Sequence, residues 1–592
     1  MLRARSVRKS WRKTLGGMWL LVAVCASSLL GQTPGAPKAA RATPARPKLV
    51  VVLVVDQMRG DYVDKFLGQW KGGLKRLVEE GAWFRDAAYP YAATETCVGH
   101  ATISTGSLPA THGMVANAWW DREAQKVVTC TADPNAKNIG YASASVKGGD
   151  TAWRMEVPSF AEELKFQSGG GTRVVTFSLK ARAAITLAGH KGDAVTWFDS
   201  AAGAWATSSA YGAMPFMEDY AEAHPPKEDY GKTWTLSLPE TAYAYDKEAK
   251  GAGPPSGWDL AFPHPLRGKN AGPEPDAAYY EEWQASPFAD AALTRLAEAA
   301  VDSLGLGQGR GTDFLAIGYS PLDYAGHAFG PRSWEIQDIL VRLDEDLKEL
   351  FTHLDKKVGR GNYVVALSAD HGVVPIPEDM QQTGADAGRL HLPEVQQRLE
   401  KALEPLNYPK PAVARIAGSD IYFATGVYQR LKGDAAAMNA VLEAIQGVPG
   451  VLGVYRAEDL AERSSTYNSP LREAMADSFF AARSGDLFIV PKAYWLVDST
   501  PAGDAKRYGT GHGTPWNYDQ HVPVILMGFG IKAGEYHGAI TPVDIASTLA
   551  ALCGITLAPR DGRVLSEALR QSVMPQAARK SADPETLDNP KP

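Results

Sequence analysis

Six acidic and histidine residues follow apolar segments that are typical of buried strands, either directly or in the loop beyond. They are Asp56, Asp323, His327, Asp370, His371 and His512. Open α/β sheets place their chemistry at the carboxyl ends of their strands, so we expect these side chains to gather at one edge of a sheet. Carboxylate oxygens and neutral imidazole nitrogens suit zinc, and two sets of them would hold a pair of ions. With Thr96 as a candidate nucleophile, the pattern is typical of two-metal phosphoryl transfer.

The spacing of these residues indicates how they would be shared between two ions. Asp323 and His327 are four residues apart, so a single helical turn would aim both at one ion, and His512 could complete that site. Asp370 and His371 are adjacent, and at a curling strand end they either converge on one ion or divide between two. Taken singly, an Asp after a strand is more often a helix N-cap and a lone His is more often structural. The hypothesis therefore rests on the joint order of the motifs.

The elements that must position these residues are predicted from apolar periodicity. Continuous apolar runs predict the buried strands of a parallel sheet, and these runs are KLVVVLVVD, RVVTFSLK, DFLAIGYS, NYVVALSAD and VPVILMG. Amphipathic segments between them, near 291–304 and 336–351, predict helices. We therefore expect an α/β fold with a central, mostly parallel sheet flanked by helices.

Two basic residues and a threonine are placed to act on an anion. Lys180 and Arg182 end the run RVVTFSLKAR, and in extended backbone they would share a face that suits a clamp on one phosphate dianion. Seen alone, such a pair is more often a solvated one. Thr96 precedes the segment 99–105, which is expected to be helical. An N-cap is the ordinary role of such a threonine, but a helix start also favours an anionic phosphoryl group.

The 592 residues divide into segments of different character. Basic residues followed by the apolar stretch 18–30 predict a signal peptide at 1–31, and the protein is then expected to be periplasmic or secreted. An uncleaved anchor, or a lipid anchor at Cys25, is the alternative, although the stretch is short for a membrane span. Residues 32–47 are predicted to be a flexible linker, 48–572 a catalytic domain with insertions at about 201–284 and 375–500, and 573–592 a loose tail.

Composition limits the classes of partner. The net charge of −6, from 61 basic and 67 acidic residues, gives no electrostatic footprint for nucleic acid. After export, Cys97, Cys130 and Cys553 allow at most one internal disulfide, and Cys97 is expected to be a small buried residue, not a reactive thiol. No stable membrane insertion is expected after signal cleavage. The oligomeric state is left open, and a monomer is compatible with the sequence.

Six motifs taken together resemble the alkaline phosphatase superfamily, and most of all its bacterial phosphomonoesterases with a threonine nucleophile. The motifs are VVDQMRGDY, TETCVGHATISTGSLPATHGMVAN, FSLKARAAITLAGH, PLDYAGHAFGP, SADHG and GTGHGTPWNYDQHVP. The resemblance extends from about Lys48 to Pro559. It implies a zinc-dependent hydrolase that acts on small phosphate monoesters through a phosphothreonine intermediate.

The resemblance also implies a role for each matching position. One zinc would be held by Asp56, Thr96, Asp370 and His371. The other zinc would be held by Asp323, His327 and His512. The nonbridging phosphate oxygens would be contacted by Asn117, Lys180 and Arg182. Histidines 100, 112, 190 and 521 lie in the motifs but not at ligand positions, so they are expected to be structural or to support the ligands.

Several other functions fit the sequence less well. A nucleotide pyrophosphatase or phosphodiesterase of the same fold would share the ligands and threonine, but its second ester group would collide with the cationic clamp. A sulfatase needs C-x-P-x-R or S-x-P-x-R, which TCVGH is not. A metal-independent phosphoglycerate mutase would have a serine nucleophile and no export signal. A binding protein without turnover is disfavoured because Thr96 and all six ligands are present.

Overall fold

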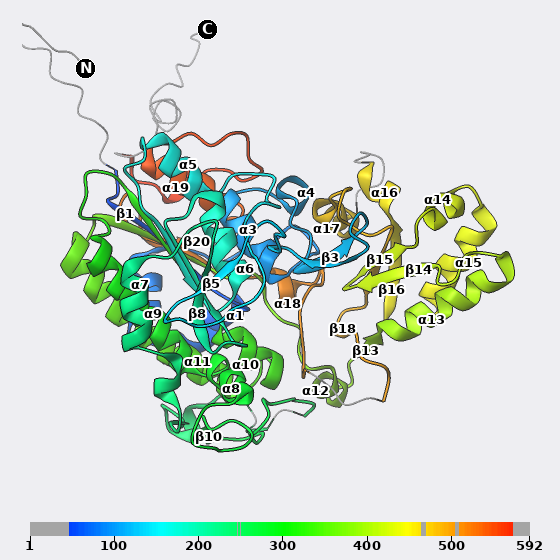
Figure 1. Ribbon diagram of the computed structural model, residues 1–592, viewed down its shortest axis with the longest axis horizontal. Coiled ribbons are helices and arrows are strands. Elements are labelled where there is room, and N and C mark those ends of the chain that lie inside the picture. Colours follow the sequence, from blue (N-terminus) through cyan, green and yellow to red (C-terminus); the bar gives the residue numbers. More distant parts are fainter. Residues whose placement is uncertain (1–45, 246, 249, 463–468, 504–507, 572–592) are drawn as a thin grey trace, which may run out of the picture. The chain divides into compact units, whose positions relative to one another are not determined.

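The computed structural model describes residues 46–571 except 246, 249, 463–468 and 504–507 (Figure 1). The predicted signal peptide, all but the last two residues of the predicted linker, and the predicted tail lie outside the described residues. Within the described part, no helix is both long enough and apolar enough to cross a membrane.

A ten-stranded sheet forms the centre of the fold, with the strand order β20-β2-β19-β12-β1-β11-β6-β7-β8-β5. Its middle five strands are parallel, and they are β12 (Tyr363–Ser368), β1 (Leu49–Val55), β11 (Asp313–Tyr319), β6 (Val174–Ser178) and β7 (Ala194–Asp199). The outer strands are β20 (Gly534–Tyr536), β2 (Ala82–Phe84), β19 (Val524–Gly528), β8 (Ala204–Ser208) and β5 (Asn138–Gly140). The predicted α/β fold with a mostly parallel sheet is confirmed.

Strand β1 shows why the sheet is buried on both faces. Its seven residues are all apolar, and alternate side chains point to opposite faces of a strand. Leu49, Val51, Leu53 and Val55 join one apolar cluster, whereas the residues between them join another. The first cluster includes helices α9 (Pro287–Leu304) and α11 (Trp334–Leu354), and the second includes α3 (Thr96–Thr105), α6 (Ala181–Ala188) and α19 (Asp544–Cys553). Each fully buried Val or Leu side chain contributes roughly 1.5–3 kcal/mol.

The register of the parallel strands sets where the site forms. Val55 of β1 lies opposite Tyr319 of β11, and Val54 lies opposite Ser368 of β12. The three strands therefore end at nearly the same level, so the residues that follow them are brought together. Helix α10 (Pro321–Phe329) starts immediately after β11 and places Asp323 and His327 one turn apart, as the spacing predicts.

The prediction that Lys180 and Arg182 share the face of a strand is wrong. Strand β6 ends at Ser178, Lys180 is the extended N-cap residue of α6, and Arg182 lies in the first turn of that helix. The segment ARAAITLA is rich in alanine, the strongest helix former, and it buries an apolar face against the sheet. Helical propensity therefore ends the extended backbone earlier than the basic pair suggested.

The two segments predicted as insertions contain their own elements. Between 201 and 284, short helices such as α7 (Pro215–Ala223) and α8 (Ala277–Gln284) alternate with irregular chain. Between 375 and 500, an antiparallel sheet of β14 (Val413–Ala417), β15 (Asp420–Phe423), β17 (Leu487–Pro491) and β16 (Val451–Arg456) packs with α13 (Leu392–Leu403) and α15 (Ala435–Gln446). This is a small α+β unit with an apolar cluster of its own. The exact boundaries of the insertions stay a prediction.

A disulfide joins Cys97, in the first turn of α3, to Cys130, which follows β4 (Lys126–Thr129). The expectation that Cys97 is simply a small buried residue is therefore wrong in part, because its sulfur is bonded as well as buried. Cys553 is free and buried. Since Asn117 begins the chain that leads into the β3 (Ala118–Asp121) and β4 hairpin, the disulfide ties this hairpin to the helix that carries Thr96.

Candidate metal centre and nucleophile

The structure brings all six predicted ligands to the carboxyl edge of the parallel strands. Asp56 follows β1, Asp323 and His327 lie on α10 after β11, and Asp370 and His371 follow β12. His512 comes from the loop between β18 (Trp495–Asp498) and α18 (Asn517–Gln520), and its ring stacks on that of His371 with 3.5 Å between the ring centroids. Residues separated by more than 450 positions in the sequence therefore meet at one place.

Asp323, His327 and His512 form the first group of potential ligands. One ligand atom from each lies within 4.8 Å of the others. Asp323 Oδ1 is 3.3 Å from His327 Nε2 and 3.9 Å from His512 Nε2. The three side chains of the set inferred from the sequence therefore converge, and a tetrahedral zinc site needs such a set plus one open position.

The orientation of the imidazole rings suits metal binding. The Nδ1 atoms of His327, His371 and His512 lie 2.9, 2.9 and 2.8 Å from the backbone carbonyl oxygens of Thr510, Gly372 and Thr94. An Nδ1–H that donates to a carbonyl leaves the Nε2 lone pair available to a metal, as is usual for ligating histidines. Burial lowers the pKa of His371 and His512, so both rings are held neutral, which is the form that binds metal.

The second group of potential ligands contains a histidine that the sequence analysis set aside. Asp56 and Asp370 offer oxygens within 4.8 Å of each other and of a nitrogen of His100. His371 Nε2 lies 3.3 Å from Asp370 Oδ2 and 3.5 Å from the hydroxyl oxygen of Thr96. Both histidines thus contact Asp370, and the assignment of His371 as the ligand stays a prediction. His100 lies one turn after Thr96 on α3. Residues four apart on a helix share a face, so this spacing could have predicted that His100 lies at the same site as Thr96.

A lysine ammonium lies between two of the carboxylates. Lys180 Nζ is 2.8 Å from Asp56 Oδ2 and 2.5 Å from Asp323 Oδ2, and all three side chains are buried. Burial raises the pKa of both carboxyls, but Lys180 together with the neighbouring histidines outweighs it and holds the pKa of both below its usual range. Three buried carboxylates within one site demand positive charge, and the lysine supplies only one unit of it.

Unpartnered polar atoms test whether a metal fits. Asp56 Oδ1, Asp370 Oδ2 and His100 Nε2 are buried and make no hydrogen bond of ordinary geometry among the described residues, and the contacts of these side chains with one another and with His371 are long, at 3.3–3.5 Å. Burial raises the pKa of Asp370, as it does for any carboxyl that lacks a full complement of donors. Buried polar atoms of this kind are costly unless they are satisfied. The oxygen and nitrogen donors therefore fit a divalent cation of the zinc type at this position.

Thr96 is the first residue of helix α3, and its side chain is buried at the site. The free backbone N–H groups of a helix start carry partial positive charge that favours an anionic phosphoryl group. Two neighbouring side chains are held in place beside it. Asn117 Oδ1 accepts from Cys97 N at 2.8 Å, and Glu95 Oε2 accepts from Asn117 N at 2.6 Å. Arg182 Nε is buried and has no partner among the described residues, so it can donate to an anion.

Sequence reasoning missed several residues that support the ligands. Ser320 Oγ donates to Asp56 Oδ2 at 2.9 Å, and Gln57 contacts carboxylates of both groups. Asp519 Oδ2 accepts from the backbone N and the hydroxyl of Thr514, while its carbonyl accepts from Gly372 N. Asp519 therefore ties the loop of His512 to the loop of His371. Most of these contacts join residues that are far apart in the sequence, so the motifs alone do not predict them.

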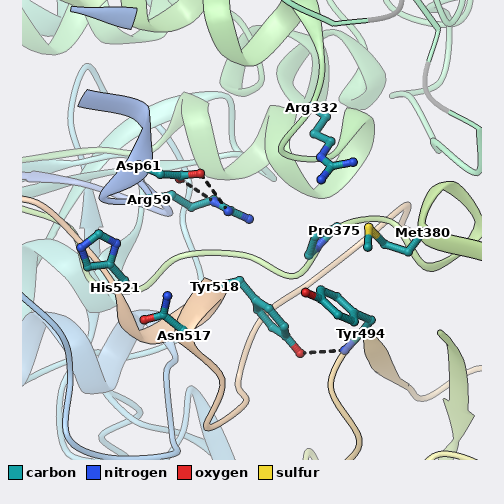
Figure 2. A pocket seen from close by; sticks show the side chains of 9 residues that line it. All are labelled: Arg59, Asp61, Arg332, Pro375, Met380, Tyr494, Asn517, Tyr518 and His521. Atoms are coloured by element: carbon teal, nitrogen blue, oxygen red, sulfur yellow. Dashed lines mark hydrogen bonds and ion pairs between the residues drawn. The ribbon is translucent and has the colours of Figure 1, made fainter. Parts of the chain in front are cut away.

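A cavity of about 250 Å³ lies next to this edge but is lined by other residues (Figure 2). Its lining consists of Arg59, Asp61, Arg332, Pro375, Met380, Tyr494, Asn517, Tyr518 and His521. Arg59 is paired with Asp61 through two hydrogen bonds of 2.9 and 3.0 Å, and Lys65 pairs with the same carboxylate. None of the ten predicted site residues lines the cavity, which we therefore keep separate from the candidate centre.

Comparisons with known proteins agree on a relationship that covers most of the chain. The sequence model of the family described as type I phosphodiesterase / nucleotide pyrophosphatase matches residues 50–517. The alkaline phosphatase PhoV of Synechococcus elongatus is 32% identical over 89% of this chain and 94% of its own length. The alkaline phosphatase PafA of Elizabethkingia meningoseptica is 32% identical over 91% of this chain and 96% of its own length.

A solved structure extends the similarity to the fold. The crystal structure of wild-type alkaline phosphatase PafA superposes with a TM-score of 0.80 at 31% sequence identity, covering 90% of this chain and 100% of that one. A murine ectonucleotide pyrophosphatase / phosphodiesterase 5 structure has a TM-score of 0.50 at 15% identity, and it supports the fold alone.

We predict that the buried Asp519 makes stability depend on pH. Burial raises the pKa of Asp519 to about 7, whereas an unfolded Asp titrates near 4, so the folded protein holds an extra proton between these values. The free energy of unfolding should then fall as the pH rises through that window, by up to about 1.4 kcal/mol per unit. Burial also raises the pKa of Asp346 and Asp420 to about 7, so Asp519→Asn should reduce the slope by one such contribution and not abolish it. Urea unfolding in EDTA at several pH values between about 4.5 and about 7.5 measures how the free energy of unfolding depends on pH.

The exposed Asp259 offers a matched control, and Asp259→Asn should follow the wild type. Equal slopes in the wild type and in Asp519→Asn would contradict the assignment of a neutral carboxyl at position 519.

Proposed function

The chain belongs to the type I phosphodiesterase / nucleotide pyrophosphatase family within the alkaline phosphatase superfamily, and we propose that it is an exported, zinc-dependent phosphomonoesterase, an alkaline phosphatase. The observation that carries the proposal is the convergence of two groups of Asp and His donors beside the buried hydroxyl of Thr96. Two relatives at 32% identity that are named alkaline phosphatases support the same activity.

We propose that Asp323, His327 and His512 would hold one zinc ion, and that Asp56, Asp370, His371 and the Thr96 oxygen would hold the other. When bound, the two ions would lower the pKa of the Thr96 hydroxyl and neutralise charge on the oxygens that enter and leave. Asp, His and threonine oxygen donors, with two buried carboxylate oxygens that have only long contacts to histidine nitrogens, support this choice of metal.

The residues of the chain divide the remaining work. Thr96 Oγ attacks the phosphorus, a new O–P bond forms, and the bond to the ester oxygen breaks to release the alcohol. Water then attacks the phosphothreonine, which returns Thr96 to its hydroxyl form and releases phosphate. The start of α3 lies beneath the phosphoryl group, and Asn117 and Arg182 donate to its nonbridging oxygens.

Lys180 would compensate the charge of two carboxylates and would also donate to the phosphate. Its ammonium compensates Asp56 and Asp323, as the ion pairs of 2.8 and 2.5 Å indicate. With zinc bound to those carboxylates, the ammonium is free to donate to a phosphate oxygen, as the family resemblance implies for this position. A lysine can make this change because its flexible stem carries a compact charge with three donors.

The proposed substrates are small phosphate monoesters. A monoester dianion presents three nonbridging oxygens, which suits several donors, whereas a diester replaces one of them with a second ester group. The acidic net charge supports the view that nucleic acid is not a partner. Export is supported by the signal-like N-terminal sequence and by the Cys97–Cys130 disulfide, since disulfides persist outside the cytosol. We propose one catalytic domain from 48 to 572.

Diester hydrolysis is the second candidate, because the matching family model carries the name of a phosphodiesterase. The ligands and Thr96 would serve either substrate. Donors to the third phosphate oxygen decide between them, so Arg182 is the residue that distinguishes the two candidates.

We predict that Thr96→Ala loses at least about a thousandfold in kcat on an aryl phosphate, because the attacking oxygen is removed. Zinc content should stay near two ions per chain, because six protein ligands remain. Turnover and elemental analysis of the same sample measure both. Thr105→Ala, at the far end of α3, is the matched control and should keep its activity. Near wild-type turnover by Thr96→Ala would exclude it as the nucleophile.

We predict that Arg182→Ala slows a monoester by roughly 10–100-fold while changing a methyl aryl diester by less than about threefold, because only the dianion needs the extra donor. Rates on the matched pair of substrates give the ratio directly. Arg173 directly precedes the start of β6, at the opposite end of that strand from α6, and Arg173→Ala should leave both rates unchanged. Equal losses on the two substrates would remove the assigned role of Arg182.

A further inference from the structure

One buried glutamine contacts a carboxylate from each of the two predicted metal sites. Gln57 is 1% exposed and directly follows Asp56. Its backbone N–H donates to Asp370 Oδ1 at 3.0 Å, and its side-chain Nε2 donates to Asp323 Oδ1 at 2.6 Å. Gln57 thus holds two predicted ligands, Asp370 and Asp323, which follow the two strands that flank β1.

The backbone of Gln57 adopts a conformation that side chains other than glycine rarely accept. Its φ is +67°, and it is the third residue of the turn that Met58 N closes onto Val55 O at 3.1 Å. A turn with positive φ at this position favours glycine or asparagine. Residues held in sparsely populated backbone regions cluster at functional sites, where the surrounding structure determines them. Since glycine would fit the backbone better, the reason for glutamine lies in its side chain.

Helix α10 is shaped to receive that side chain. At Gly326, an added Cβ would lie 1.8 Å from Gln57 Oε1, so any other residue there would displace the amide from its present position. Glycine is a poor helix former, and here it lies in the turn between Asp323 and His327. The helix that carries two predicted ligands therefore packs directly on the Gln57 amide.

The two oxygens of Asp323 have different partners. Gln57 Nε2 donates to Oδ1, and Lys180 Nζ pairs with Oδ2. The amide is neutral, so it orients the carboxylate without competing with a metal for its charge. Oδ1 is also the oxygen nearest to His327 and His512. The hydrogen bond from Gln57 therefore holds the Asp323 carboxylate with Oδ1 facing His327 and His512.

We propose that Gln57 is a positioning residue that sets the zinc affinity of the Asp323, His327 and His512 site. This inference rests on the proposed function, because it requires both sites to bind zinc. Donors that support ligating carboxylates typically change metal affinity about 10–100-fold when they are removed. The bond to Asp370 comes from the backbone and survives any side-chain substitution that preserves the turn, so the two contacts can be separated.

The test is a zinc titration of the full chain after its metal has been removed with chelator. In Gln57→Gly, the affinity for one of two zinc ions should fall about 10–100-fold, and the affinity for the other should stay within about threefold. The melting temperature of the metal-free variant is recorded beside the titration, because glycine accepts a φ of +67° but leaves a gap under α10 where the amide packed. Gln57→Glu keeps the length of the side chain and replaces the donor with an acceptor, so it should show the same selective loss.

The chain offers a matched control. Gln125 also has a positive φ, of 49°, and lies exposed in the turn between β3 and β4. Gln125→Gly makes the same replacement in the same backbone region, and it should bind both zinc ions as the wild type does.

The possible outcomes separate the two claims. If the wild type fails to bind two zinc ions, the proposed function is wrong. If the wild type binds two but Gln57→Gly binds both with unchanged affinity, the role of Gln57 is wrong and the proposed function stands. Unchanged affinity in Gln57→Glu would likewise overturn the role of its hydrogen bond. Equal weakening of both ions would show a general loss of structure and would also contradict the inference.

Discussion

The structure depends on gathering three buried carboxylates, those of Asp56, Asp323 and Asp370, at one edge of a parallel sheet. Isolated charges are expensive to bury, and one lysine compensates only part of this charge. Oxygens of Asp56 and Asp370 are left without hydrogen bonds within the described part of the chain. A site with this deficit of positive charge is built for cations, and imidazoles whose Nδ1 atoms face backbone carbonyls present Nε2 to it.

The fold meets this requirement through strand register. Strands β1, β11 and β12 are buried throughout, are mostly apolar and end at nearly the same level, so the polar residues that follow each strand meet. Apolar clusters on both faces keep the sheet rigid, which holds the carboxylates at their separations. Helices α3 and α10 then start beside the sheet edge and contribute Thr96, Asp323 and His327. Helices thus carry Thr96, Asp323 and His327, Asp56, Asp370 and His371 lie in the turns directly after strands, and His512 comes from a longer loop.

Much of this arrangement was predictable from the sequence, because its signals are local. Apolar runs that end on Asp56 and Asp370 predict strands and their edge, and the spacing of Asp323 and His327 predicts one helical turn. Long-range packing decided the rest. Helix α6 begins before Arg182, so the expected extended pair with Lys180 does not form. The pairing of Cys97 with Cys130 and the contacts of Gln57 depend on chain separated by up to several hundred residues, which no local pattern encodes.

The most direct test of this account is anomalous X-ray scattering at the zinc absorption edge, from crystals of the zinc-loaded protein. The account predicts two separate peaks per chain, one bounded by Asp323, His327 and His512 and the other by Asp56, Asp370 and His371, with the Thr96 oxygen beside the second. Lys180 should then have moved off at least one of its two carboxylates. A single peak, peaks elsewhere in the molecule, or no peak with Lys180 still bridging Asp56 and Asp323 would contradict it.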